Sequence, residues 1–133
     1  MSLPDGWTED TKDDMYEENS FVMFENPDSC LFIVFIGKKS AGMTVDAILE
    51  TQKESYLKKF TEVTTSNFGE WAGYQGKGIE ISGKIGGALQ YRTRIFGLEN
   101  GDNVGAVIEA STPADMGKYA GDYEMIRQTF KLK

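Results

Sequence analysis

The sequence contains no histidine and a single cysteine among its 133 residues. A catalytic thiol needs an activating base, and the chain offers no imidazole for that role. One cysteine cannot form a disulfide within the chain. Cys30 opens the apolar run 30–36, so we expect its thiol to be buried and inert, as a small hydrophobic side chain.

Long apolar runs are also missing. The longest, residues 30–36, is far short of the ~18 residues that a membrane-spanning helix needs, so we expect no transmembrane segment. Residues 1–7 lack the charged and apolar regions of a signal peptide. We therefore expect a cell-envelope or secreted protein if a leader was removed, and a cytoplasmic one otherwise.

Basic residues are scarce at the start of the chain. Residues 1–28 contain nine acidic residues and only Lys12 as a basic one, so they carry the whole excess of negative charge in a chain of net charge −7. This distribution argues against nucleic acid or an anionic membrane as a partner, because both need clustered Lys and Arg. We expect residues 1–19 to be a solvated, partly mobile acidic lead-in, with docking to a basic partner or a cation as the alternatives.

Recognised cofactor motifs are absent. Residues 37–44 contain two glycines but lack the lysine at the end of a phosphate-binding loop, directly before the final threonine. Residues 10–18 are dense in carboxylates but do not match a calcium loop. We therefore expect neither a cofactor nor a metal, and no catalytic residues.

One long segment has a clear helical period, residues 44–60. Its apolar face is formed by Val45, Ile48, Leu49, Gln52, Tyr56 and Phe60. Thr44 is placed as the N-cap, and Asp46 lies in the first turn, where the helix dipole favours an anion. The sequence therefore predicts one amphipathic helix that packs on a sheet.

The residue pattern predicts β-strands over most of the remaining chain. Residues 21–25 and 30–36 predict a hairpin around the turn 26–29. Residues 62–67, 71–82, 87–98 and 104–111 predict a meander, and the pair Asn100 and Gly101 predicts a tight turn before its last strand. Because residues 30–36 are apolar on both faces, we expect both faces of the sheet to be covered.

A second helix is predicted over residues 113–130, after Thr112 as cap and Pro113 at its first position. The fold expected is therefore a single α+β domain spanning residues 1–133. Its antiparallel sheet would have about six to seven strands, with helices on both faces.

Glycine is concentrated in the meander: ten of the fifteen glycines lie between Gly69 and Gly105. Glycine within strands marks bulges and bends, which predicts a strongly curled sheet wrapped around the first helix. A glycine-lined groove that binds a ligand is the alternative.

The most promising cluster for chemistry is Arg92 and Arg94, which are two apart and so share one face of a strand. Lys77 or Glu80 could lie opposite them on the neighbouring strand. Guanidinium forks bind carboxylates and phosphates well, but a row of cross-strand ion pairs is the simpler interpretation. Glu80, Glu99 and Glu109 do not form a recognisable catalytic pair.

The order of elements and several short stretches resemble the PsbP-like and DcrB-like proteins, whose fold is shared with the Ran-binding nucleotide-release factor. The stretches are residues 3–7, 24–28, 43–46, 71–74, 109–113 and 128–131. The resemblance implies an α/β/α sandwich without catalytic activity that docks on a protein partner, which in the studied members is a small GTPase, a photosystem or unknown envelope machinery.

We therefore expect a non-catalytic interaction or assembly module whose partner is a protein. Its contact surface would include exposed aromatic residues, the arginine pair and the acidic lead-in. The residues are Trp7, Trp71, Tyr74, Arg92, Arg94, Asp13, Asp14, Glu17 and Glu18. The alternative is a binder of a small molecule or lipid, with a pocket between the curled sheet and the first helix.

Overall fold

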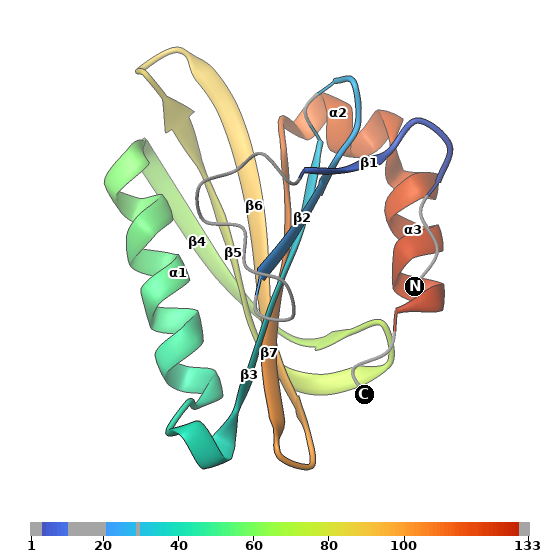
Figure 1. The fold of residues 1–133 in the computed structure, drawn as a ribbon. Helices are drawn as coiled ribbons and strands as arrows, with labels where there is room; N and C mark the ends of the chain where they lie inside the picture. Colours follow the sequence, from blue (N-terminus) through green and yellow to red (C-terminus); the bar gives the residue numbers. More distant parts are fainter. Residues whose placement is uncertain (1–3, 11–20, 29, 131–133) are drawn as a thin grey trace.

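The computed structural model describes residues 4–10, 21–28 and 30–130. They form one antiparallel sheet of seven strands in the order β1-β2-β3-β7-β6-β5-β4. The strands are β1 (Thr8–Asp10), β2 (Phe21–Glu25), β3 (Leu31–Lys38), β4 (Phe60–Trp71), β5 (Tyr74–Ile85), β6 (Leu89–Asn100) and β7 (Asn103–Ser111). Figure 1 shows α1 on one face of this sheet and α2 and α3 on the other, so the predicted sandwich is confirmed.

The first hairpin forms where the sequence predicts it, between β2 and β3. Asn26 closes its turn, because its side-chain oxygen accepts hydrogen bonds from the backbone N–H of Asp28 and Cys30, at 3.0 and 2.9 Å. This is the local bonding that makes asparagine a turn residue. Phe32 and Val34 then point into one core, and Ile33 into the other, which explains why β3 is apolar on both faces.

Helix α1 (Val45–Lys59) connects β3 to the far edge of the sheet. Thr44 caps it, with Oγ1 accepting from the N–H of Ala47 at 3.1 Å. Ile48 is buried against Val104 and Ala106 of β7. A Cβ at Gly97 would lie 2.5 Å from Cγ1 of Val45, so this glycine allows the helix to approach β6 closely.

The meander β4 to β7 follows the prediction, but its first strand is longer than the predicted 62–67 and its first and last turns are shifted along the chain. β5 begins at Tyr74 and not at Trp71, because Ala72 and Gly73 form the turn, both with positive φ. The last turn is formed by Gly101 and Asp102, one residue later than the expected pair, with Asn100 opposite Asn103. Gly101 has φ of +62°, which suits the first central position of a hairpin turn.

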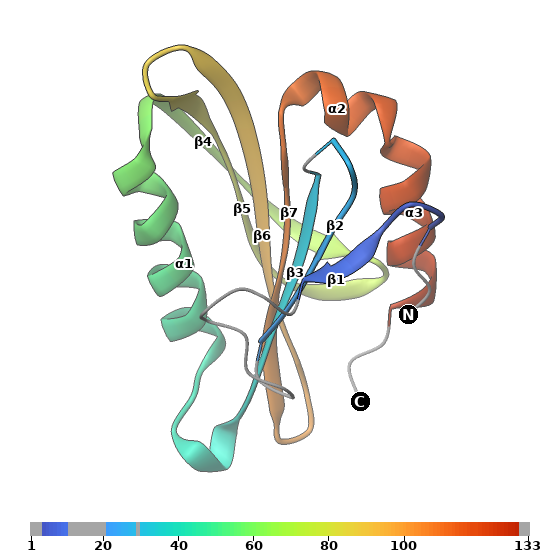
Figure 2. The ribbon, with the colours of Figure 1, turned by 45° about the horizontal axis from the view of Figure 1, so that its top comes forward.

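The predicted second helix is two helices, α2 (Pro113–Lys118) and α3 (Ala120–Thr129). Thr112 caps α2 through a 3.2 Å hydrogen bond from the N–H of Asp115. Tyr119 lies outside the helical region between them, with φ −104° and ψ 21°. Figure 2 shows the two helices following one another along the same face of the sheet, where Tyr123 and Ile126 are buried.

Candidate functional site

Arg92 and Arg94 lie side by side on β6, on the face that α2 and α3 cover. The register pairs Arg94 with Glu80 of β5, as predicted, whereas Lys77 lies opposite Gly97 and pairs with Asp46 of α1 instead. Nε of Arg94 is 3.5 Å from Oε1 of Glu80, and Nε of Arg92 is 3.8 Å from the same oxygen. The expected cross-strand ion pairs are therefore present.

Glu109 of β7 lies next to Arg94 on its other side and is only 2% exposed. Its Oε2 accepts hydrogen bonds from Nε of Arg127 at 2.9 Å and from the indole N–H of Trp71 at 3.1 Å. Its Oε1 accepts from Nη2 of Arg127 at 3.3 Å and lies 3.5 Å from Nη1 of Arg94. A buried carboxylate needs such partners, because an unpaired charge in the interior is very costly.

Arg127 projects from α3 and binds two carboxylates. Its Nε and Nη2 both donate hydrogen bonds to Glu109, and its Nη1 donates to Glu124 at 2.8 Å. Burial opposes its charge, but the hydrogen bonds and attraction to Glu109 and Glu124 outweigh burial and raise the pKa of Arg127 above its ordinary value. The four side chains of Glu109, Arg127, Arg94 and Trp71 thus tie β7, α3, β6 and β4 together.

A groove of ≈ 450 Å³ opens above these charges, and we call it the Arg92 groove. Glu80, Arg92 and Arg94 line it from the sheet, and Glu109 lies at its base. The opposite wall comes from the two C-terminal helices, and consists of Pro113, Met116, Gly117, Ala120, Tyr123, Glu124 and Arg127.

A second hollow of ≈ 590 Å³, the Tyr74 hollow, lies on the other side of Arg127. It is lined by Ala72, Gly73, Tyr74, Glu124, Arg127, Gln128 and Phe130. Because Glu124 and Arg127 line both hollows, they separate the two. The side of the molecule that carries α2 and α3 therefore has two neighbouring depressions, with Glu124 and Arg127 between them.

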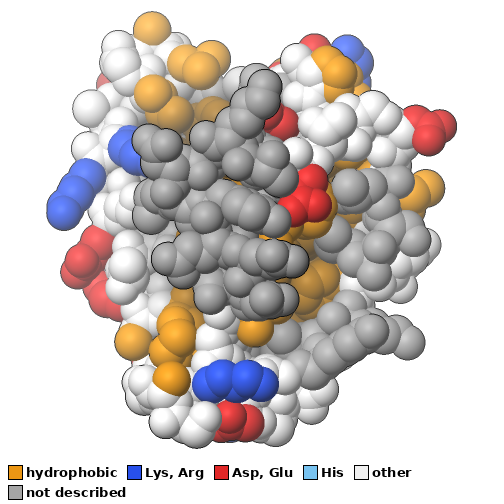
Figure 3. Space-filling view, in the orientation of Figure 1, with side chains coloured by type: hydrophobic (Ala, Val, Ile, Leu, Met, Phe, Trp, Pro, Cys, Tyr) orange, Lys and Arg blue, Asp and Glu red, His pale blue; other side chains and the backbone are white. Residues whose placement is uncertain are grey.

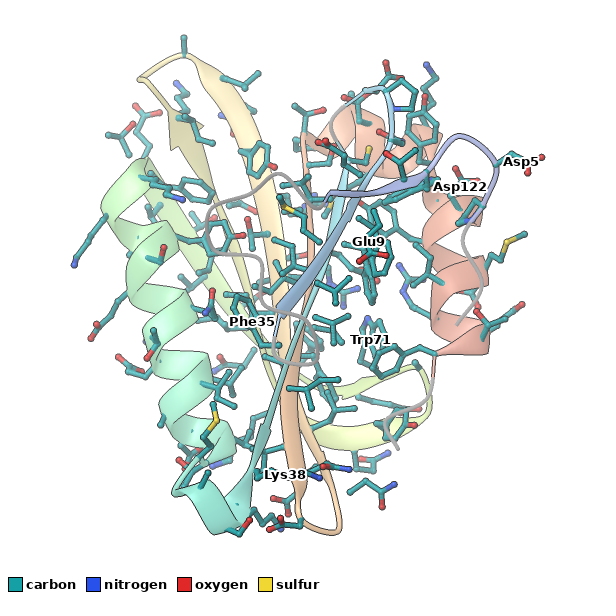
Figure 4. The ribbon with its side chains drawn as sticks, in the orientation of Figure 1. Asp5, Glu9, Phe35, Lys38, Trp71 and Asp122 are labelled. Atoms are coloured by element: carbon teal, nitrogen blue, oxygen red, sulfur yellow. The ribbon has the colours of Figure 1, made fainter. Side chains whose placement is uncertain are left out.

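The predicted exposure of the tryptophans is wrong. Trp7 is 6% and Trp71 3% exposed, because both pack in the core beneath α3. Trp7 donates its indole N–H to Asp122 at 3.0 Å, and Trp71 stacks near Phe32 and Phe96. Figure 4 shows Trp71 between the sheet and α3, and Asp122 on α3 beside the segment that carries β1.

The other predicted contact residues fall into two groups. Tyr74 is half-buried and lines the Tyr74 hollow, and Arg92 and Arg94 line the Arg92 groove. Asp13, Asp14, Glu17 and Glu18 lie outside the described residues. The structure therefore brings the arginine pair and Tyr74 to the same side of the molecule, whereas both tryptophans are buried in its core.

Sequence reasoning missed Glu109, Arg127 and Glu124. The available signal was a lone carboxylate within the otherwise apolar run 104–111, since such a residue is almost never buried without a partner. The identity of its partners was not visible, because Trp71 and Arg127 come from elements distant in the sequence.

In the part of the chain that the structure describes, several glycines of the curled sheet face α1 and neighbouring aromatic rings. Gly97 faces Val45 and Leu49 of the helix, and Gly78 and Gly83 face the rings of Phe68 and Phe60. A hollow of ≈ 340 Å³ beside Gly76 and Gly97 is open at the end of α1 and is lined mainly by polar residues. Close packing therefore accounts for these glycines.

Two further properties bear on function. Among residues 4–10, 21–28 and 30–130, no group of three or more acidic or cysteine residues is placed to hold a metal ion. No helix in the same part of the chain is both long and apolar enough to cross a membrane.

Two solved structures share this fold. The PA94 protein of Pseudomonas aeruginosa, of unknown function and with a suggested role as a regulator, matches with a TM-score of 0.62 and 16% identity over 90% of this chain and 88% of that one. The cyanobacterial PsbP protein (CyanoP) of Synechocystis sp. PCC 6803 matches with a TM-score of 0.61 and 12% identity over 98% and 84%.

These matches show that the fold is PsbP-like, as the sequence resemblance implies. Neither the models of protein families nor the curated protein sequences give a match to this chain. At such low identity the structural likeness establishes the fold alone, and function has to be argued from the surface of this molecule.

Proposed function

We propose that this chain is a non-catalytic interaction module, and that it binds a protein partner through the surface formed by the Arg92 groove and the Tyr74 hollow. The observation that carries the proposal is the network around Glu109. It holds Arg94 and Arg127 in fixed positions at a surface depression, with Arg92 and Tyr74 beside them. Arginine and tyrosine are residues on which binding energy at protein interfaces is often concentrated.

The charged groups of the groove are better arranged to bind a partner than to catalyse a reaction. Glu109 is engaged by Arg94, Arg127 and Trp71, and Glu124 by Arg127. A general base must instead be within reach of a substrate proton.

A photo-crosslinking experiment tests it. A benzophenone side chain would be placed at Gly117, where a Cβ meets open space on the groove wall, and at exposed Glu54 of α1 as the matched control. In the organism that makes this protein, we expect a defined protein adduct from position 117 and none from position 54. Identical adducts from both positions, or none from position 117, would contradict the proposed surface.

A small-molecule or lipid site is the second candidate, and one observation favours it. A hollow of ≈ 270 Å³ lies between β3 and the start of α1, lined by Phe35, Gly42, Met43, Thr44, Ala47, Ile48, Thr51 and Gln52. Figure 3 shows hydrophobic side chains gathered over this part of the surface, and Met43 is 38% exposed. Saturable binding of an apolar fluorescent probe that Met43→Gln abolishes would support this candidate.

We further propose the bacterial cell envelope as the location, and the resemblance to DcrB-like proteins is what supports it. Fractionation of the producing cells with an antibody against the folded chain tests this proposal. Recovery in the cytoplasmic fraction alone would refute it.

A further inference from the structure

We infer that the Arg92 groove receives a carboxylate from an acidic segment of the partner protein, with Arg92 and Arg94 as its anchors. This inference rests on the proposed function and adds the chemistry of the partner. Four features of the groove support it: the unused hydrogen-bonding capacity of Arg92, the fixed position of Arg94, the balance of charges and the apolar wall.

Arg92 is the arginine whose donors are not taken up by the network. Its Nε lies 3.8 Å from Oε1 of Glu80, which is too long for a hydrogen bond. The same Nε is enclosed by protein atoms and has no hydrogen-bond partner among the described residues, although the side chain as a whole is 40% exposed. A guanidinium has five N–H donors. Because Nε is enclosed, the two terminal nitrogens of Arg92 would donate to an incoming carboxylate, without breaking an existing hydrogen bond.

The neighbouring Arg94 is held in one orientation by its contacts. Its guanidinium lies over the ring of Phe68, 4.4 Å from the centroid, and contacts Glu80 and Glu109. These contacts fix the orientation of the side chain on a strand in the interior of the sheet. A ligand therefore meets a preorganised cation, which lowers the entropy lost on binding.

The charges that line the groove offer no excess of positive charge to a multiply charged ligand. Arg92, Arg94 and Arg127 face Glu80, Glu109 and Glu124, so the formal charges cancel. A phosphate carries about two negative charges at neutral pH and would be repelled by Glu80 and Glu124. A carboxylate carries one, and its two oxygens match the guanidinium fork.

The opposite wall favours a peptide over a small free carboxylate. Pro113, Met116 and Ala120 of α2 and α3 present an apolar surface across from the arginines. A volume of ≈ 450 Å³ accommodates an acidic residue together with apolar neighbours. We therefore expect the partner to supply an aspartate or glutamate flanked by small or apolar side chains.

The test is selection from two libraries of blocked hexapeptides with randomised flanks, one with a fixed central aspartate and one with asparagine at that position. We expect binders from the aspartate library only. The bound peptides should perturb amide NMR signals of β6 and α2. Arg92→Gln should weaken binding by at least tenfold and Arg92→Lys by less, because lysine keeps the charge but loses the fork.

Lys58→Gln on exposed α1 is the control, since it removes one charge from the opposite face, and it should change binding less than twofold. Binders from both libraries, no binders at all, or an unchanged affinity of Arg92→Gln would overturn the inference. So would inorganic phosphate that displaces the peptides at equal concentration, because the site would then be a general anion site.

The two proposals fail in different ways. If the crosslinker at position 117 still captures its partner from the Arg92→Gln variant with undiminished yield, the groove is an interface but the carboxylate inference is wrong. If position 117 captures nothing from the unaltered protein, the proposed interface itself is wrong.

Discussion

At the scale of single residues, the feature with the largest expected effect on stability is the buried carboxylate of Glu109. Its two oxygens accept three hydrogen bonds, from Arg127 and Trp71. Removing one partner of a buried ion pair leaves the other charge uncompensated, which costs more than the pair itself contributes. Residues of the same type in the same groove should therefore differ greatly in their effect.

The first prediction compares two arginines. Arg127→Ala should lower the free energy of unfolding by about 3–5 kcal/mol, because Glu109 would remain buried with its main partner gone. Arg92→Ala should lower it by under ~0.5 kcal/mol, because Arg92 is half-exposed and its contact with Glu80 is long. Urea denaturation followed by tryptophan fluorescence measures both. Equal losses would show that the network around Glu109 does not stabilise the fold.

The second prediction concerns Cys30, which is fully buried with its Sγ 3.2 Å from Oγ of Ser111. As the sequence predicts, the thiol lies in the core. It should therefore resist an aromatic disulfide reagent in the native protein and react at once after denaturation. Rapid reaction of native protein at neutral pH would instead indicate that this part of the core opens readily.

At the scale of secondary-structure elements, the contact of α1 with β6 depends on the absence of a side chain at Gly97. Gly97→Ala would place a methyl group 2.5 Å from Cγ1 of Val45 and 3.0 Å from Cγ of Leu49. Overpacking of this kind costs about 1–3 kcal/mol. Gly117→Ala in α2 meets no atom within 4 Å and should stabilise by about 0.5–1 kcal/mol, through helix propensity.

Thermal unfolding of the two glycine variants checks this pair of predictions. The expected result is a lower midpoint for Gly97→Ala and a higher midpoint for Gly117→Ala. A neutral Gly97→Ala would mean that α1 can move away from the sheet at no cost, and its close packing on β6 would not be required.

Another contact between elements depends on pH. Asp102, in the turn between β6 and β7, accepts hydrogen bonds from the hydroxyl and the N–H of Ser40, at 2.8 and 3.0 Å. Ser40 lies in the short 3-10 helix Lys39–Ala41 before α1. The side-chain hydrogen bond from Ser40, followed by its backbone hydrogen bond, lowers the pKa of Asp102 below the ordinary value of 3.8. The ionised form is therefore favoured in the folded state.

A lowered pKa in the folded state means that the stabilisation is complete above the unfolded pKa and is lost as the pH falls through the folded one. We expect Asp102→Asn to be less stable than the unaltered protein at pH 7, with a difference that shrinks below pH 4. NMR titration of the Asp102 carboxyl and unfolding curves at several pH values measure this. A titration midpoint at or above 3.8 would contradict it.

Much of the fold could be predicted from the sequence because its signals are local. The α1 period, the Thr44 cap and the two-sided apolar pattern of β3 each depend on neighbours in the chain. The break at Tyr119 was less visible, since the apolar face of residues 113–130 continues through it. The shift of the first meander turn to Ala72 reflects a positive φ in a residue that rarely adopts one.

The candidate site was predictable only in part. Alternation along a strand placed Arg92, Arg94 and Glu80 together. The burial of Trp7 and Trp71 was not predictable, because it depends on α3, which lies about fifty residues or more away in the sequence. The same holds for Glu109, whose partners come from β4, β6 and α3.

At the scale of the whole molecule, charge is distributed unevenly, and the acidic lead-in gives the last prediction. If that segment docks on a basic patch of the partner, apart from the acidic segment that the Arg92 groove would receive, neutralising Asp10, Asp13, Asp14, Glu17 and Glu18 together should slow association more than it speeds dissociation. The effect should decrease with added salt, because exposed charges are screened over about 10 Å at 0.1 M. Surface plasmon resonance with the captured partner at two ionic strengths measures it. An unchanged association rate at low salt would remove the segment from the interface.

The order of strands also has a consequence for how the protein is made. The β1 to β3 segment and the β4 to β6 segment are joined in the sheet by β7, which pairs with β3 on one side and β6 on the other. β7 is the last strand to be synthesised. On the ribosome the two halves of the sheet therefore cannot be joined until Ser111 has left the exit tunnel. A chain arrested earlier would expose two open strand edges, and it would need protection from aggregation.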